Sequence, residues 1–114
     1  MNVRSYDPFA LIKDGNLPKS EIVAFYLLYY LYHQHKRFGN GFTTNYAYEL
    51  LADIFNLSEE QLNYKMNDGR NHWKNRVQYA KRDLKNKKLV TEKDTGYWII
   101  EEKGIELMSL ICLK

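Results

Sequence analysis

The sequence predicts a mainly α-helical domain with one small β-hairpin, which is the outline of a winged helix-turn-helix. The first observation is the order of patterns, in which several helical segments precede two short strand patterns and one more helix follows. The second is composition. The 114 residues are 45% apolar and 15% aromatic, enough to build one hydrophobic core. We therefore expect residues 1–114 to form a single winged-helix domain.

The first part of the chain is expected to hold an extension and one long helix. Residues 1–18 form the extension, in which an Asp-Pro pair and a glycine favour a short helix over residues 7–15. The long first helix is expected over residues 19–37. Residues 22–32 are apolar nearly all round this helix, which indicates a helix that is central in the core or covered by a partner. The run is too short to span a membrane.

Two helices are expected in the middle of the chain, over residues 43–64. The longer one covers residues 46–55, and either Thr44 or Asn45 can cap its N-terminus. The shorter one follows a serine and a glutamine placed three residues apart at positions 58–61, which is the pattern of a capping box.

The last part of the chain is expected to hold a recognition helix, called the reading helix below, followed by the β-hairpin of the wing and a C-terminal helix. The reading helix is expected over residues 71–86, after an Asn-Asp-Gly turn. The wing occupies residues 88–100, with two strands at residues 89–91 and 97–100 and a glycine in the turn between them. A C-terminal helix is expected over residues 104–113.

The helix over residues 71–86 divides into an apolar side and a basic side. Four residues fall within about 60° on a helical wheel and should face the core: Trp73, Val77, Ala80 and Leu84. The opposite side carries amides and cations and no acid. Amides can pair with adenine edges, and cations can bind guanine edges or phosphates. The predicted DNA-binding residues of this region are Arg70, Asn71, Lys74, Asn75, Gln78, Lys81, Arg82, Lys85 and Lys87, with Lys93 and Thr95 on the wing.

Position along the helix divides these residues by expected role. The first half of a reading helix reaches base edges, so base contacts are expected from Asn71, Lys74, Asn75 and Gln78. Phosphate contacts are expected further along and on the wing, from Arg82, Lys85, Lys87, Lys93 and Thr95. Arg76 is turned off the outer face and is expected to brace the fold or to reach a flanking phosphate.

The charge of the chain is concentrated around this helix. Residues 65–93 contain ten basic residues and three acids, a net charge of +7, whereas the other residues together carry −4. Such an asymmetry is the electrostatic pattern of a protein that binds a polyanion. An ordinary solvated lysine-rich helix is the alternative.

Three segments resemble the N-terminal domain of Mrr-like restriction proteins. The run Trp73–Val90 contains the family's aromatic, Asn-Arg-Val, aromatic-Ala and Lys-Lys-Leu elements in order. The strand Gly96–Ile100 with the following Glu-Lys-Gly, and the upstream run Tyr48–Leu62, are also similar. The family has tryptophan where this chain has Tyr79. The resemblance covers residues 43–108 and implies a winged helix that engages DNA for a restriction or anti-phage system, with a nuclease domain or subunit as partner.

Parts of the sequence are also compatible with other functions. Glu101, Glu102 and Lys103, with Asp83 or Asp94, resemble half of a metal-dependent nuclease site, but such a site needs a larger sheet. We therefore expect no catalytic residue, no metal site and no cofactor. A standalone transcriptional regulator and a protein-interaction winged helix stay as alternatives.

Partners and location follow from the same features. We expect double-stranded DNA as the main partner, no membrane, a cytoplasmic location and a homodimer through the first or the last helix. Whether a modified base is read stays open, and the aromatic residues that could hold a flipped base are Trp73, Tyr79 and Trp98.

Overall fold

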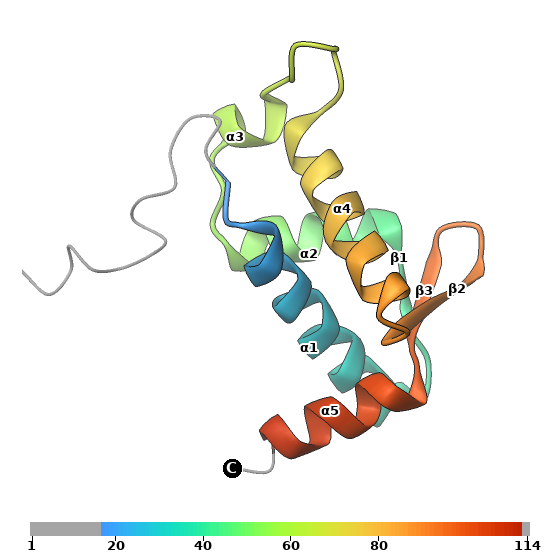
Figure 1. Cartoon of the computed structure of the whole chain (residues 1–114). Coiled ribbons are helices and arrows are strands. Elements are labelled where there is room, and N and C mark those ends of the chain that lie inside the picture. Colours follow the sequence, from blue (N-terminus) through green and yellow to red (C-terminus); the bar gives the residue numbers. More distant parts are fainter. Residues whose placement is uncertain (1–16, 113–114) are drawn as a thin grey trace, which may run out of the picture.

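The computed structural model describes residues 17–112 as five helices packed with a small antiparallel sheet (Figure 1). The expected short helix over residues 7–15 lies outside these residues. The elements, in chain order, are α1 (Ser20–Phe38), β1 (Phe42–Thr43), α2 (Thr44–Ile54), α3 (Glu59–Asn63), α4 (His72–Asn86), β2 (Val90–Asp94), β3 (Tyr97–Ile100) and α5 (Glu102–Cys112). This is a mainly helical winged helix, as the sequence predicts.

Helix α1 forms the centre of the core. It packs most extensively against α4 and also touches α2, α5 and β3. Its buried residues are Val23, Ala24, Leu27, Leu28, Leu31 and Tyr32. The apolar residues on its other sides are only partly covered, with Ile22 and Phe25 39% and 41% exposed. No helix within residues 17–112 is long and apolar enough to cross a bilayer.

The sheet has three strands in the order β1-β3-β2, where the sequence predicted a two-stranded hairpin. The additional strand β1 pairs antiparallel with β3, with Phe42 opposite Trp98. Gly41 makes this pairing possible, because a Cβ atom there would lie 1.7 Å from the carbonyl oxygen of Trp98. A two-residue strand has no alternation long enough to be recognised in the sequence.

The wing is longer than predicted on its first side. β2 runs from Val90 to Asp94 rather than ending at residue 91, and its pairing with β3 is irregular between Glu92 and Asp94. A bulge of this kind accommodates one additional residue and lets the strand continue. The turn holds Gly96 at a φ of 81°, which favours glycine.

Helix α2 begins earlier than predicted, at Thr44 rather than at residue 46, and its cap is Thr43. The Thr43 hydroxyl accepts a hydrogen bond from the Tyr46 amide at 3.1 Å. Thr44 was a predicted cap, but its hydroxyl bonds to the sheet instead, at Trp98 and Gly96. The capping box of α3 between Ser58 and Gln61 is confirmed.

The bounds of α4 agree with the prediction at its C-terminal end, whereas α5, predicted over residues 104–113, is described over Glu102–Cys112. Helix α4 covers the predicted range except that its first residue is the cap. Helix α5 begins at Glu102, two residues before the predicted start, which places an acid in its first turn where the helix dipole favours it.

Candidate nucleic-acid interface

The four residues of α4 that the sequence predicts to face the core do lie on its inward side. Trp73, Val77, Ala80 and Leu84 are each at most 4% exposed. The Trp73 indole also donates a hydrogen bond to the backbone oxygen of Tyr48 at 3.0 Å. This packing fixes the rotation of α4 and turns the basic side away from the helical body.

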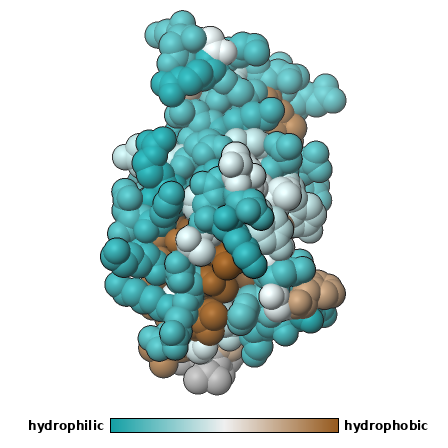
Figure 2. Space-filling view, turned by 90° about the vertical axis from the view of Figure 1, so that its right-hand side faces the viewer, coloured by the Kyte–Doolittle hydropathy of each residue, from teal (hydrophilic) through white to brown (hydrophobic). Residues whose placement is uncertain are grey.

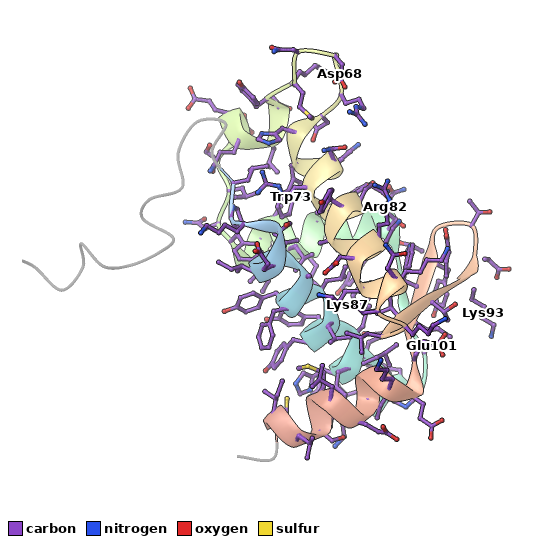
Figure 3. The ribbon with its side chains drawn as sticks, in the orientation of Figure 1. Asp68, Trp73, Arg82, Lys87, Lys93 and Glu101 are labelled. Atoms are coloured by element: carbon purple, nitrogen blue, oxygen red, sulfur yellow. The ribbon has the colours of Figure 1, made fainter. Side chains whose placement is uncertain are left out.

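The outward side of α4 presents three exposed cations, Lys74, Arg82 and Lys85. Arg82 lies on the outer side of the helix, towards the wing, whereas Trp73 lies towards α1 and α2 (Figure 3). The Nζ of Lys74 is 5.5 Å from the centre of the Tyr48 ring, so Tyr48 supports it from below. None of these three cations forms an ion pair within residues 17–112. Their charges are therefore available to an anionic partner.

Two amides lie between these cations and are half-buried. Gln78 donates a hydrogen bond to the Tyr48 hydroxyl at 2.6 Å, so its amide nitrogen is already engaged. Asn75 has no side-chain hydrogen bond within the described part of the chain, and it lines a hollow of about 440 Å³ with Tyr79 and His72. Asn75 is therefore the freer of the two amides for pairing with a base edge.

The wing adds two exposed predicted residues, Lys93 and Thr95. It stands beside the C-terminal half of α4 (Figure 1). Glu92 stabilises the wing turn by accepting a hydrogen bond from the Gly96 amide. The side of the molecule that carries the wing is hydrophilic over most of its area, apart from a small apolar patch low in the view (Figure 2).

Three predicted residues have other contacts in the structure. Asn71 caps α4, because its side-chain oxygen accepts from the Lys74 amide at 2.9 Å and its nitrogen donates to the Leu62 oxygen at 2.7 Å. Arg70 forms an exposed ion pair with Asp68 at 2.7 Å. Backbone and side-chain hydrogen bonds from Arg70 lower the pKa of the Asp68 carboxyl. Lys87 pairs with Asp83 at 3.0 Å and stays exposed.

Lys81 was predicted on the exposed side of α4 but is buried, at 8% exposed. Its Nζ donates to the Thr44 hydroxyl at 3.2 Å and lies 4.2 Å from the centre of the Trp98 ring. The Trp98 indole donates to the same hydroxyl at 3.0 Å. Thr44 thus joins α2, α4 and β3, a role that no pattern within one element could reveal.

Arg76 braces the fold, which is one of the two roles that the sequence predicts for it. Its guanidinium donates to the backbone oxygen of Pro18 and lies 3.4 Å from the Nε2 of His72. Burial lowers the pKa of Arg76, and Glu21 opposes this effect. These contacts tie α4 to the segment that enters α1.

The three aromatic residues that could have held a flipped base do not offer a common surface. Trp73 and Trp98 are 2% and 4% exposed, and both indoles are hydrogen-bonded inside the protein. Tyr79 is 58% exposed on α4. A cage built from these three side chains is therefore excluded in this conformation.

The acids near β3 belong to the start of α5. Glu102 lies in the first turn of α5, and Glu101 and Lys103 border a hollow of about 660 Å³ together with Lys85 and Glu106. Asp83, a possible second carboxylate, is paired with Lys87. Within residues 17–112, no three His, Cys, Asp or Glu side chains are grouped as a metal site would require.

The order of elements and the sheet make this chain a winged helix-turn-helix protein, with α4 in the position of the reading helix. The sequence model of the Mrr N-terminal domain matches residues 26–109, and the chain therefore belongs to this family. The match includes α4 and the whole wing and confirms the resemblance found in the sequence. It associates the chain with Mrr-like restriction systems. The searches of curated proteins and of solved structures found no match.

Proposed function

We propose that this domain binds double-stranded DNA and serves as the target-recognition part of an Mrr-like restriction system, with nuclease activity supplied by a separate domain or subunit. The observation that carries the proposal is the outward side of α4, where Lys74, Arg82 and Lys85 are exposed and have no ion-pair partner among residues 17–112. In helix-turn-helix proteins this side enters the major groove.

The roles proposed for the individual residues follow from their surroundings. Asn75 and Lys74 lie in the first half of α4 and are assigned to base edges, with Gln78 joining them if it releases Tyr48. Arg82, Lys85 and Lys93 are assigned to phosphates, and Thr95 to the same backbone from the wing. Asn71 and Arg70 are assigned to shaping the start of α4 rather than to contact with DNA.

Equilibrium binding to labelled duplexes over about 50–200 mM salt tests the proposal. Arg82→Ala or Lys93→Ala should weaken binding to all sequences alike and reduce the slope of log affinity against log salt by about one unit each, because each removes one phosphate contact. Lys36→Ala is the matched control, since Lys36 is an exposed lysine in the last turn of α1. If Arg82→Ala and Lys93→Ala show the same salt slope as Lys36→Ala and wild type, then α4 and the wing do not have the proposed role.

A second arm of the same experiment concerns sequence readout. With duplexes selected from a random pool, Asn75→Ala should reduce discrimination between preferred and other sequences by roughly 1–3 kcal/mol. Asn86→Ala is its control, because Asn86 is an exposed asparagine at the end of the same helix. If Asn75→Ala leaves the preference intact, then Asn75 does not read a base.

We also propose that two copies associate, since a dimer presents two reading helices to a palindromic site roughly 34 Å apart. Apolar residues of α5 at helical spacing support this, because Leu107, Leu110 and Ile111 are 41%, 68% and 46% exposed. Sedimentation should give a dimer that Leu110→Glu converts to a monomer. A wild-type monomer at high micromolar concentration would contradict the proposal.

A further inference from the structure

Within residues 17–112, Lys81 is a buried cation that forms no ion pair with a carboxylate. It is 8% exposed, and its ammonium group contacts a neutral hydroxyl, that of Thr44, and an aromatic ring, that of Trp98. The ion pairs of the described chain join Arg70 to Asp68 and Lys87 to Asp83, so none includes Lys81. Buried charges in proteins are normally paired, because removing an ammonium group from water is costly.

The surroundings of Lys81 offset this cost only in part, since the net effect on its pKa is a lowering. Burial lowers the pKa of Lys81, and the neighbouring positive charges of Lys85 and Arg82 lower it further, while Glu92 opposes them. Packing alone does not explain the residue, because a methionine has a side chain of similar length and carries no charge to desolvate. A buried, perturbed and unpaired cation beside a hollow is a candidate for binding a ligand of opposite charge.

Lys81 lines a hollow between α4 and the wing. The hollow has a volume of about 420 Å³ and is bordered by Gln78, Arg82, Lys85, Glu92 and Thr95 as well as by Thr44 and Trp98. Three cations and one carboxylate therefore surround it. The other donors on its border are the amide of Gln78 and the hydroxyl of Thr95. This set of donors suits an anion that carries several acceptor oxygens, as a phosphate does.

We propose that one phosphodiester group of the DNA backbone enters this hollow and that Lys81 holds it from below. The inference rests on the proposed DNA binding and adds a specific anchor to it. The phosphate supplies the direct ion-pair partner that Lys81 lacks among residues 17–112, while Arg82 and Lys85 reach it from the border. Lys81 contacts Thr44 and Trp98, so its ammonium group is held in one place between α4 and the wing. The bound phosphate would therefore hold the DNA backbone at a fixed position relative to both elements.

The proposal predicts effects of opposite sign for Lys81→Met on stability and on binding. The urea midpoint of the free protein should rise, because the unpaired charge is removed and the aliphatic length is kept. Affinity for duplex DNA at about 0.1 M salt should fall roughly tenfold, and the salt slope should decrease by about one unit. Lys74→Met is the control, since Lys74 is exposed and its removal should leave the urea midpoint nearly unchanged.

A duplex series with single uncharged methylphosphonate linkages locates the contact. One linkage should weaken wild-type binding clearly more than it weakens binding by Lys81→Met, since the variant has already lost the Lys81 part of the interaction and keeps those of Arg82 and Lys85. Titration with inorganic phosphate tests whether the hollow binds a free phosphate ion or a phosphodiester group of DNA. Weak binding of phosphate alone, with tight binding of duplex, supports a phosphodiester of the backbone.

Two different failures can be told apart. Duplex binding by wild type and Lys81→Met with equal affinity and equal slope overturns the anchor and leaves the proposed function intact. No duplex binding by wild type at low salt overturns the proposed function itself. A third result also overturns the anchor. If Lys81→Met lowers the urea midpoint, and if every methylphosphonate linkage weakens wild type and Lys81→Met equally, then Lys81 serves only the core.

Discussion

Trp73→Ala is expected to lower the free energy of unfolding by about 3–5 kcal/mol, the usual cost of removing a large buried aromatic side chain. Trp73 is 2% exposed, meets the ring of Phe55 edge-on at 6.3 Å and donates to the backbone oxygen of Tyr48. Its removal leaves a cavity beneath α4 and takes away the indole hydrogen bond that joins α4 to α2. Urea denaturation followed by circular dichroism measures the change.

Tyr79→Ala is the matched control for this prediction. Tyr79 is an aromatic residue on the same helix and is 58% exposed, so its removal should change the stability by less than about 1 kcal/mol. Trp73→Phe separates the two contributions, since it keeps a ring and removes the hydrogen bond to Tyr48. A loss below about 1 kcal/mol for Trp73→Ala would contradict the position of α4 in the core.

Reversing two charges on the outward side of α4 is expected to abolish most of the DNA binding. The double variant Arg82→Glu, Lys85→Glu removes two proposed phosphate contacts, each worth roughly tenfold in affinity at about 0.1 M salt. Repulsion between the new acids and the phosphates adds to this loss, so affinity should fall by about a hundredfold or more. Both residues are exposed, and the fold should stay intact.

The control for net charge lies on α1. The double variant Lys36→Glu, Arg37→Glu changes the total charge by the same amount at two exposed residues in the last turn of α1. Its effect on duplex affinity should be much smaller at salt concentrations where the Debye length is about 10 Å. An equal loss for both double variants would mean that overall charge, and not a defined surface, attracts DNA.

The periodic parts of the fold could be predicted from the sequence because their packing is encoded locally. The apolar stripe of α4 repeats at helical spacing, and Trp73, Val77 and Leu84 are buried as that spacing requires. The exposure of Lys74 and Arg82 follows from the same rotation of the helix. The wing was predictable because two β-rich runs are separated by a turn with glycine.

The contacts between distant segments could not be predicted in this way. Lys81 stands at the margin of the stripe, and its burial depends on Thr44, 37 residues earlier, and on Trp98, whose indole shares the Thr44 hydroxyl. Strand β1 depends on the close approach of Gly41 to Trp98. Each case requires a tertiary pairing that no single helix or strand pattern contains.

Asn71 illustrates a second limit of sequence reasoning. An asparagine at the start of a helix can cap it or can read a base edge, because both roles use the same carboxamide. The pattern on the helical wheel favoured the interface, whereas the structure has both ends of the side chain bonded, to Lys74 and to Leu62. Asn75 is one turn further along and keeps its carboxamide free within the described residues.

A nuclear magnetic resonance titration of the labelled 13.7 kDa chain with a short duplex tests the central claim most directly. Binding should shift the amide signals of α4 from Lys74 to Lys85 and those of the wing around Lys93, while α1 and α5 change little beyond any dimer contact. Saturation at low salt and release at high salt should accompany these shifts. If the spectrum stays unchanged at low salt, or if the shifts lie on α1 and α5 alone, α4 and the wing are not a DNA-binding surface.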